Sequence, residues 1–495
     1  MDKIRLSQLK SGSDVRGVAM DPQEGQTLDL TNDGAARIGA AYARWLKAGT
    51  GKDNLTVAVG RDSRLTGPDL LQAFTVGLIS EGTKVYDTGL CTTPAMFMTT
   101  QDAELDADGA AMITASHMPY NRNGIKMVTK DGGLAPSDVA DILADAETTD
   151  MRMLPGGKRE VTDFLPTYAA GIVDMVRQRT GEERPLEGAR IVVDAGNGAG
   201  GYFVSDVLEP LGADTTGSQF LEPDGRFPNH IPNPEAAEAI EAIERAVRDN
   251  DADLGIIFDT DVDRSAIVDE KGNSINKSAF IAFIAEQVLE EFPGSTIVTD
   301  SVTSNGLAKF IEERGGVHRR FKRGYKNVID EAKRINAEGG ESHLAMETSG
   351  HGAIKENYFL DDGSYLAMLA LTAFAKAKKK GSTISEYLAS YHAPLEELEV
   401  RYKITAEDFR AYGQDLLEKF RDFAAKQPGW TIVEPNYEGI RVDCTDQDED
   451  GWILVRMSLH EPVLPVNIES DAKGGAQKIL GTFEDFLKDF TELKK

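Results

Sequence analysis

Three stretches of the chain repeat one pattern of apolar and polar positions: "NLTVAVGRDSR" (54–64), "ARIVVDAGNGAG" (189–200) and "STIVTDSVTSNG" (295–306). In each, a short β-branched run ends at an aspartate, polar turn residues follow, and a helical stretch comes next. A glycine and a second strand-like segment then follow, as in "SEGTKVYDTG", "PLGADTTGSQ" and "ERGGVHRRFKRG". Strand–helix–strand repeats of this kind are typical of parallel sheets with crossover helices. The pattern therefore predicts three similar mixed-sheet α/β domains.

The last hundred residues follow a different pattern. The strand-like segments "LEVRYKI", "WTIVEP", "GIRVDCT" and "GWILVRMS" accompany an amphipathic helix near 405–426 and a closing helix, which predicts a smaller C-terminal α+β domain. The expected domains are 1–157, 158–273, 274–392 and 393–495. Ligands of α/β sheets gather at the carboxyl ends of the strands. We therefore expect the domains to surround a central cleft lined by the polar turns.

Composition excludes several classes of protein. The formal net charge is −28, which argues against a nucleic-acid surface because such surfaces are basic. Apolar runs fall well short of the ~20 residues of a membrane span, so we expect no membrane contact and a cytoplasmic location. Cys91 and Cys444 show no metal-binding spacing and are expected to be small buried residues.

The stretch "MITASHMPYNRNGIK", Met112 to Lys126, joins an apolar run to a Ser116–His117 pair and a turn rich in Pro, Asn and Gly. Taken alone, such a pair is more often a solvated turn than a site, because turn residues have their own local physics. A functional role for Ser116 must come from the rest of the chain.

Three aspartates alternate in "GIIFDTDVDRSAIVDE": Asp259, Asp261 and Asp263. Carboxylates this close repel one another unless a cation lies among them, so the stretch predicts a divalent-metal site. An EF-hand is rejected, because Arg264 occupies the sixth loop position and the flanks are strands. Two alternatives stay open from the residues alone. One is a haloacid-dehalogenase-like phosphatase that uses Asp259 as its nucleophile, and the other is a solvated acidic loop.

Further polar turns carry candidate binding residues. "RMSLHEPVLPVNIES" offers Arg456 and Ser458, and a guanidinium fork beside a hydroxyl suits a phosphate. The turns "KRGYK" and "METSGHGAIKENYF" add the candidates Arg323, Lys326, Glu347, Ser349 and His351. A carboxylate and a hydroxyl two residues apart, as in the second turn, can hydrogen-bond sugar hydroxyls.

The glycines of "DAGNGAG" fit the dinucleotide fingerprint as Gly196-x-Gly198-x-x-Gly201. A lone match of this kind is weak. No other feature of the sequence indicates a nicotinamide cofactor.

Taken in order, these motifs resemble those of the α-D-phosphohexomutase superfamily, most closely its phosphomannomutase/phosphoglucomutase branch. The resemblance rests on "GSDVRGV" around Arg16, "VGRDSRLTG", "TASHMP", "DAGNGAG", "PDGRFPNHIPNPE", "DTDVDR", "ETSGH" and "RMSLHEP". The family usually has TASHNP, DGDxDR and RxSxTEP. Here Met118, Thr260 and His460 stand in place of the Asn, the Gly and the Thr.

The resemblance implies a phosphohexomutase that interconverts hexose 1-phosphate and hexose 6-phosphate, for glucose, mannose or both. It implies a phosphoserine at Ser116, a hexose 1,6-bisphosphate intermediate and activator, and Mg²⁺ held by Ser116, Asp259, Asp261 and Asp263. It assigns Lys126 as the general acid/base, with Arg16 and His117 assisting. The implied substrate-binding residues are Arg264, Arg323, Lys326, Glu347, Ser349, His351, Arg456 and Ser458. The expected partner is a small phosphosugar, and the expected state is a monomer or a homodimer.

Overall fold

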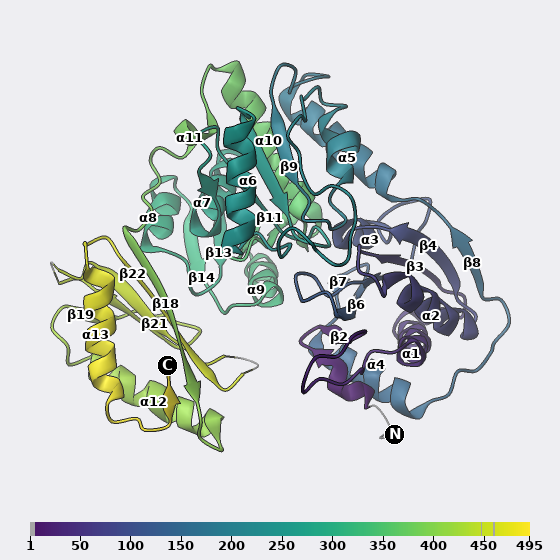
Figure 1. Ribbon diagram of the computed structural model, residues 1–495, viewed down its shortest axis with the longest axis horizontal. Helices are drawn as coiled ribbons and strands as arrows, with labels where there is room; N and C mark the ends of the chain where they lie inside the picture. Colours follow the sequence, from purple (N-terminus) through teal and green to yellow (C-terminus); the bar gives the residue numbers. More distant parts are fainter. Residues whose placement is uncertain (1–4, 447, 459–460) are drawn as a thin grey trace. The chain divides into compact units, whose positions relative to one another are not determined.

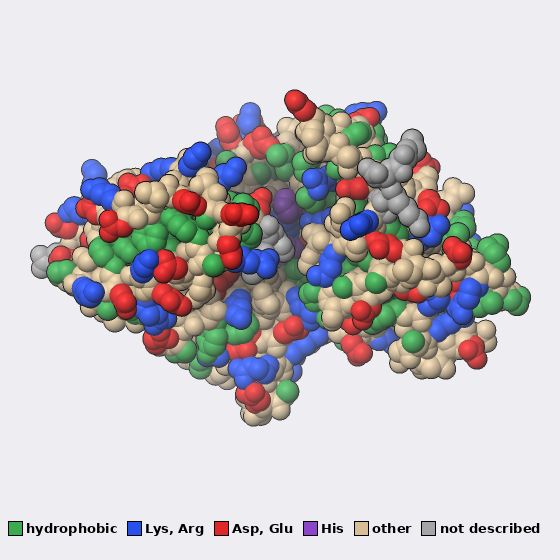
Figure 2. Space-filling view, turned by 90° about the horizontal axis from the view of Figure 1, so that it is seen from below, with side chains coloured by type: hydrophobic (Ala, Val, Ile, Leu, Met, Phe, Trp, Pro, Cys, Tyr) green, Lys and Arg blue, Asp and Glu red, His purple; other side chains and the backbone are tan. Residues whose placement is uncertain are grey.

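The computed structural model describes residues 5–446, 448–458 and 461–495. The chain forms two compact units, whose elements are labelled in Figure 1. The first unit comprises Met1–Asn276 and Ser349–Tyr387, and the second comprises Lys277–Thr348 and Leu388–Lys495. Within the described residues, no helix combines the length and the apolar character that a membrane crossing needs. Acidic and basic side chains are interspersed over the face shown in Figure 2, although the net charge is strongly negative.

The first sheet of the first unit has the strand order β1-β2-β6-β5-β3-β4-β8, and β7 pairs with β6. Its strands are β1 (Lys10–Ser11), β2 (Asp14–Val18), β3 (Thr56–Arg61), β4 (Lys84–Leu90), β5 (Gly109–Ile113), β6 (Arg122–Thr129), β7 (Gly132–Gly133) and β8 (Lys158–Val161). Strands β5, β3, β4 and β8 run parallel, β6 is antiparallel to β5, and β2 is antiparallel to β6. Every residue of β5 is buried, as expected for a strand covered on both faces.

Helices cover this sheet: η1 (Leu6–Leu9), α1 (Asn32–Thr50), α2 (Gly67–Ser80), α3 (Thr93–Met98) and α4 (Pro136–Thr148). Helix α1 begins where the Thr31 side chain accepts a hydrogen bond from Gly34 N at 3.2 Å. Helices α1 and α2 pack closely together at Gly77. A Cβ at this position would lie only 1.9 Å from the carbonyl oxygen of Ala36, so a larger residue would force the helices apart. Apolar residues of α1 and α2 share one core with those of β3 and β5. Candidate site residues follow the carboxyl ends of these two strands.

The second sheet of the first unit has the order β12-β11-β10-β9. Its strands are β9 (Ile191–Asp194), β10 (Leu254–Phe258), β11 (Ser265–Val268) and β12 (Ser274–Ile275). Strand β10 is parallel to β9 and antiparallel to β11, so residues 259–264 form the loop of a hairpin. The same unit contains α5 (Leu165–Thr180), α6 (Ala237–Asp249), β16 (Gly352–Ile354), η3 (Lys355–Asn357), β17 (Leu360–Asp361), α10 (Gly363–Lys379) and α11 (Ile384–Tyr387). Helix α10 packs on both α5 and β11.

The second of the three repeats departs from the expected pattern. A π-helix, η2 (Phe203–Leu208), follows β9 in place of an α-helix. The segment 210–219 pairs only through the isolated bridges Arg190↔Asp214 and Asp194↔Gln219. In the glycine-rich segment before η2, the backbone packs against neighbouring chain where a side chain would collide.

The glycines of the apparent dinucleotide fingerprint have a packing role. A Cβ at Gly198 would lie 2.6 Å from the carbonyl oxygen of Thr260, and one at Gly201 would lie 2.3 Å from that of Leu221. Gly198 therefore lets the segment after β9 approach the backbone of the aspartate loop, and Gly201 lets it approach the backbone at Leu221.

The second unit begins with an α/β layer in which β14 and β15 pair with β13, all parallel. Its elements are α7 (Lys277–Glu291), β13 (Thr296–Thr299), α8 (Asn305–Glu313), β14 (Val317–Arg320), α9 (Tyr325–Ala337) and β15 (Leu344–Met346). This is the strand–helix–strand arrangement that "STIVTDSVTSNG" and the segment after it predicted.

The C-terminal part of the second unit is an antiparallel sheet with the order β19-β20-β21-β22-β18-β23. Its elements are β18 (Glu396–Ile404), α12 (Phe409–Ala424), β19 (Trp430–Ile432), β20 (Ile440–Cys444), β21 (Gly451–Val455), β22 (Val463–Ser470), α13 (Gly475–Leu487) and β23 (Leu493–Lys494). Side chains of α12 and α13 share one apolar core with the sheet. The expected fold class, α/β domains followed by a smaller α+β domain, is confirmed.

The expected domain bounds stay a prediction. Strand β8 (Lys158–Val161) adds to the first sheet by pairing with β4, although it follows the expected boundary at residue 157. Both cysteines, Cys91 and Cys444, are free and buried, as expected.

Candidate active site

Ser116 lies in the turn that follows the buried strand β5. It is buried, and its φ of 51° lies in the left-handed region that few residues other than glycine adopt. Its backbone N–H donates to Thr114 Oγ1 at 2.9 Å, and its Oγ donates to Asp259 Oδ2 at 3.0 Å. The turn therefore directs the serine hydroxyl at the aspartate loop after β10.

A buried arginine that the sequence patterns did not indicate holds this turn. The Arg64 side chain is fully buried. It donates at 2.5–2.9 Å to four backbone carbonyls, those of Ser116, Met118, Pro119 and Arg122. Asp62 accepts from the backbone N–H of Arg64 at 2.9 Å and from Thr114 Oγ1 at 2.6 Å. Met118 contributes through its carbonyl, so the replacement of the usual asparagine leaves this contact in place.

Three buried carboxylates come together in the loop after β10. Oxygen atoms of Asp259, Asp261 and Asp263 lie within 4.8 Å of one another. Val262, between the last two, has a φ of 65°, a strained conformation for a β-branched residue. Burial, together with the neighbouring Asp263 carboxylate, raises the pKa of Asp259 well above its usual range. Burial and the neighbouring carboxylate thus disfavour the charged form of Asp259.

These residues fit a divalent cation. Asp261 Oδ1 is buried and has no hydrogen-bond partner among the residues that the structure describes. Oxygen atoms are the ligands that Mg²⁺ prefers, and a cation would remove the repulsion that raises the pKa of Asp259. Thr93 supports the loop, because its Oγ1 donates to Asp261 Oδ2 and its N–H donates to the Asp261 carbonyl at 2.9 Å.

Lys126 on β6 approaches the same carboxylates. Its Nζ lies 2.7 Å from Asp261 Oδ2 and 2.5 Å from Asp263 Oδ2. Burial lowers the pKa of Lys126, but the two carboxylates outweigh this effect and hold it well above its usual range. Arg16 on the neighbouring strand β2 donates from Nη2 to Asp14 Oδ2 at 3.0 Å. Lys126 is therefore a charged proton donor in this arrangement.

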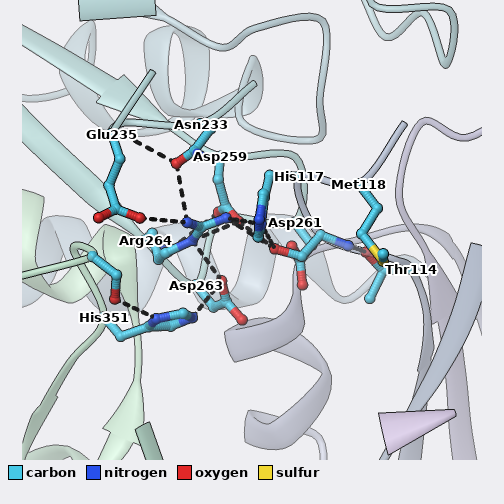
Figure 3. A network of polar contacts seen from close by, with 12 residues as sticks. Thr114, His117, Met118, Asn233, Glu235, Asp259, Asp261, Asp263, Arg264 and His351 are labelled. Atoms are coloured by element: carbon cyan, nitrogen blue, oxygen red, sulfur yellow. Dashed lines mark hydrogen bonds and ion pairs between the residues drawn. The ribbon is translucent and has the colours of Figure 1, made fainter. Parts of the chain in front are cut away.

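Arg264 connects the serine turn to the aspartate loop, as Figure 3 shows. Its Nη2 donates to Ser116 Oγ at 3.1 Å, to Asp259 Oδ2 at 3.1 Å and to His117 Nδ1 at 2.6 Å. Burial, with a smaller contribution from the positive charge of Arg264, lowers the pKa of His117 to about 2. The His117 ring is therefore neutral, and its Nδ1 is the acceptor.

Two residues that sequence reasoning missed fix the other side of Arg264. Its Nη1 donates to Asn233 Oδ1 at 3.1 Å and lies 4.0 Å from Glu235 Oε2. Both come from "PDGRFPNHIPNPE", a motif whose resemblance to the family was noted without a role for single residues. Thr260, which replaces the usual glycine, is buried, and its Oγ1 has no hydrogen-bond partner in the described part of the chain.

His351 and Ser349 belong to the same cluster in the first unit. His351 Nε2 lies 3.5 Å from Asp263 Oδ1, and its Nδ1 lies 2.9 Å from Ser349 Oγ. An isolated bridge pairs His351 with Arg264. The structure thus brings together, within the first unit, the candidates Arg16, Ser116, His117, Lys126, Asp259, Asp261, Asp263, Arg264, Ser349 and His351.

A second group of candidates gathers within the second unit around Glu438, which sequence reasoning missed. Glu438 Oε2 accepts from Arg323 N at 3.1 Å and from Ser301 Oγ at 2.5 Å, and Oε1 lies 3.9 Å from Arg456 Nη1. Glu347 Oε1 accepts from Gly324 N, the residue after Arg323, at 2.6 Å. Arg323, Glu347 and Arg456 therefore share one polar network.

Arg456 has unused hydrogen-bonding capacity. It is buried, and its Nε has no partner among the described residues. Ser458 follows on the same segment, where its N–H donates to the Val463 carbonyl at 2.9 Å and its Oγ accepts from Glu461 N at 3.3 Å. Lys326 instead contacts Asp330 on its own helix α9, at 2.9 Å. His460, which replaces the usual threonine, lies outside the described residues.

Comparison with known proteins agrees with this arrangement. Residues 7–153, 166–272 and 276–392 match the family descriptions phosphoglucomutase/phosphomannomutase, alpha/beta/alpha domains I, II and III. A phosphomannomutase/phosphoglucomutase of Pseudomonas putida is 31% identical over 480 residues, which cover 96% of this chain and 94% of the relative. A phosphoglucomutase of Neisseria gonorrhoeae is 31% identical over 478 residues, which cover 96% and 95%.

Solved structures give the same result. The crystal structure of a phosphoglucomutase/phosphomannomutase family protein from Burkholderia thailandensis has a TM-score of 0.80 and 27% sequence identity, covering 98% of this chain and 97% of that one. The family matches extend over more than half of the chain. The chain therefore belongs to the phosphoglucomutase/phosphomannomutase family of the α-D-phosphohexomutase superfamily, a family of enzymes that transfer phosphate intramolecularly.

Proposed function

We propose that the protein interconverts hexose 1-phosphate and hexose 6-phosphate, with glucose, mannose or both as the sugar. Phosphorylated Ser116 gives its phosphoryl group to the free hydroxyl of the monophosphate, which yields a hexose 1,6-bisphosphate. The bisphosphate then reorients and returns its other phosphoryl group to Ser116. Relatives with names that include phosphoglucomutase, phosphomannomutase or both support this substrate class.

The placement of Ser116 carries the proposal. Its Oγ lies 3.0 Å from Asp259 Oδ2 and 3.1 Å from Arg264 Nη2, inside a buried turn that Arg64 holds. Phosphoryl transfer depends mainly on positioning and on stabilisation of charge. A serine held between a carboxylate loop and a buried guanidinium meets both requirements.

Mg²⁺ is the cofactor that this site suits, with Ser116, Asp259, Asp261 and Asp263 as its ligands. When bound, it would neutralise the negative charge that develops on the transferred phosphoryl group. Arg264 Nη2, already within reach of Ser116 Oγ, adds positive charge at the same place. The free bisphosphate would serve as an activator by phosphorylating Ser116.

Lys126 would handle the proton of the reacting hydroxyl, with Arg16 and His117 beside it. In this arrangement Lys126 Nζ holds its proton against Asp261 and Asp263. Its pKa lies well above its usual range, since the carboxylates outweigh the effect of burial. Because a cation on those carboxylates would weaken this attraction, metal binding favours release of the proton from Nζ.

The remaining candidates would bind the substrate. Arg264, Ser349 and His351 lie beside the proposed transfer site in the first unit. In the second unit, Glu347 suits sugar hydroxyls, and Arg456 and Ser458 suit the phosphate that does not react. We assign Arg323 and Lys326 to the surrounding positive charge.

The rival function, a phosphatase with Asp259 as nucleophile, differs in its products. We expect glucose 1-phosphate or mannose 1-phosphate, supplied with Mg²⁺ and a trace of the matching 1,6-bisphosphate, to give the 6-phosphate without stoichiometric release of phosphate. Ser116→Ala should abolish the reaction. Ser205→Ala, a change at an exposed serine that contacts Asp206, is the matched control and should leave it intact. Stoichiometric phosphate release without the isomerised sugar would favour the phosphatase.

A further inference from the structure

A cavity of about 160 Å³ in the second unit is lined by cationic side chains. It lies between the end of β14 and the segment that joins β19 to β20. Its walls include His318, Arg319, Arg320, Val433, Tyr437 and Arg441. A protein whose net charge is −28 thus places three arginines around one small space.

Arg441 is the most informative of these residues, because only 2% of it is exposed. Its Nη1 donates to the Ser301 carbonyl and its Nη2 to Asn305 Oδ1, both at 3.0 Å. The Trp452 ring lies 3.7 Å from its Cζ and provides a cation–π contact. Its Nε is buried without a hydrogen-bond partner in the described part of the chain. The Arg441 guanidinium thus retains an unused donor.

Arg320 provides a second guanidinium group near the cavity, and its hydrogen bonds go to carbonyl and amide oxygens. It is partly exposed, and it donates to the carbonyls of Thr303 and Ser304 and to Asn305 Oδ1 at 2.7–3.2 Å. Among the described residues, neither Arg320 nor Arg441 forms an ion pair with a carboxylate within 4.0 Å. Buried charge without a partner is costly, so such groups normally face a counter-ion.

The other groups around the cavity are compatible with an anion. Arg319 is neutralised by Glu331, at 2.9 Å, and lies over the Tyr437 ring at 4.4 Å. Glu434, also on the wall, is exposed and pairs with Arg421 at 2.7 Å. Burial lowers the pKa of Arg441 well below its usual range, the positive charge of Arg320 adds to this effect, and the carboxylates of Glu469 and Asp443 offset only part of it. An anion between the two guanidinium groups would remove that repulsion.

We propose that this cavity is a second anion site, which binds the phosphate group of a small phosphorylated metabolite between Arg320 and Arg441. Guanidinium forks suit phosphate oxygens. The volume is about ten times the roughly 10–15 Å³ that holds one water molecule, so a phosphate group fits. Ser301 connects this cavity to the network described above, since its carbonyl accepts from Arg441 and its Oγ donates to Glu438.

Sodium tungstate, a phosphate-like anion with strong anomalous scattering, tests the site in crystals of the full chain. We expect a tungstate peak within hydrogen-bonding distance of Arg320 and Arg441. Val433→Phe, which fills the cavity, should remove the peak, whereas Val433→Ala, which enlarges it, should keep the peak. A parent crystal without tungstate at Arg320 and Arg441 would overturn the proposal. Tungstate near Arg456 and Ser458 is a separate readout, which reports on the proposed function.

Calorimetric titration with inorganic phosphate tests the same site in solution. In an Arg456→Ala background, which weakens the other proposed phosphate site, we expect phosphate binding that depends on Arg320. Adding Arg320→Gln should weaken it roughly ten- to hundredfold, because a charge-assisted hydrogen bond is lost. Arg410→Gln, the same change at an exposed arginine outside the cavity, is the matched control. Equal phosphate affinity in the Arg320 and Arg410 variants would contradict the proposal. If Arg320→Gln does not fold, the phosphate affinity of Val433→Phe, which should be reduced in the same way, provides the test.

Discussion

Ser116 has a backbone conformation that is unfavourable for any residue except glycine. A left-handed conformation at such a residue costs of order 1–3 kcal/mol, so the surrounding structure must enforce it. Arg64 does so by donating to four carbonyls of the turn, and Asp62 and Thr114 complete the support. We therefore regard Arg64 as a positioning residue for the serine.

Replacing Arg64 tests this role. Arg64→Gln should lower kcat by about a hundredfold, because small misplacements of a reacting group have effects of that size, and should change KM little. Arg64→Lys, which keeps the charge and some of the hydrogen bonds, should recover part of the loss. Arg61→Gln is the control, since Arg61 donates to the carbonyl of Asp62 and, among the described residues, to no carbonyl of the Ser116 turn. If KM rises while kcat holds, Arg64 acts on substrate binding and the positioning role is wrong.

The sequence predicted some residues of the site far better than others. The alternating spacing of the three aspartates indicated a metal site, whereas Ser116 was assigned only through the resemblance of the whole set of motifs to the family. Arg64 and Glu438 were not predictable, because their roles depend on contacts with residues far away in the chain. Arg64 binds carbonyls 52–58 positions away, and Glu438 meets Ser301 137 positions away. No local pattern distinguishes such residues from surface charges.

The aspartate loop after β10 depends on an element that resembles a dinucleotide fingerprint. The glycine-rich segment after β9 packs against this loop, and Ala199 N donates to the Thr260 carbonyl at 2.8 Å. The parallel strand β9 and the β10–β11 hairpin were predictable from apolar runs, whereas the π-helix η2 was not, because close backbone packing has no signature in apolar periodicity. Gly198, part of the apparent fingerprint, thus packs beside the aspartate loop.

Gly198→Ala tests the packing. The new Cβ would lie 2.6 Å from the Thr260 carbonyl oxygen, so the loop must shift. We expect a loss of about 1–3 kcal/mol in the free energy of unfolding, together with weaker Mg²⁺ binding. Gly171→Ala in α5, where nothing lies within 4 Å, should instead stabilise the protein by up to about 1 kcal/mol. Urea unfolding and metal titration measure both effects, and equal behaviour of the two variants would rule out the packing role.

Helix α10 begins at a buried carboxylate whose ionisation should depend on folding. Asp362 accepts from Tyr365 N at 2.9 Å, from Tyr168 Oη at 2.6 Å and from Asn357 Nδ2 at 3.0 Å. Burial nevertheless dominates and raises the pKa of Asp362 to about 6. The folded state therefore binds this proton more tightly than the unfolded state, and stability is lost as pH rises from about 4 to about 6.

Asp362→Asn should remove this dependence. Between pH 4 and pH 7 the unfolding free energy of the variant, relative to the parent, should rise by about 2 kcal/mol, from a shift of about two pH units. Urea unfolding across this range measures it. A difference between variant and parent that does not change with pH would show that Asp362 titrates alike in both states.

At the scale of the whole molecule, the candidate site residues are distributed over both units. The first contains the serine, the carboxylates and Lys126, and the second contains Arg456 and Glu347. The repeats of strand and helix predicted the fold class, because each repeat has its own apolar pattern. The division into two units was not predictable, since β8 and α10 pack on elements that lie outside their expected domains.

Arg456→Ala tests the contribution of the second unit. Losing a charge-assisted contact costs about 1.5–3 kcal/mol, which corresponds to a roughly ten- to hundredfold loss in kcat/KM. Added glucose 1,6-bisphosphate should restore part of the activity by replacing intermediate that escapes. Arg421→Ala, at an exposed arginine on α12 that pairs with Glu434, is the control. Kinetics like those of the parent would remove Arg456 from the phosphate-binding residues.

In the proposed mechanism Ser116 carries the phosphoryl group. Transfer of label from a labelled bisphosphate to the protein shows whether it does. The protein is incubated with ³²P-labelled glucose 1,6-bisphosphate and Mg²⁺, the label is mapped by peptide mass spectrometry, and unlabelled glucose 1-phosphate is added. We expect label on the peptide containing Ser116, none in Ser116→Ala, and transfer of the label into sugar phosphate at a rate that matches turnover. Label on Asp259, or label on Ser116 that stays on the protein during turnover, would contradict this mechanism.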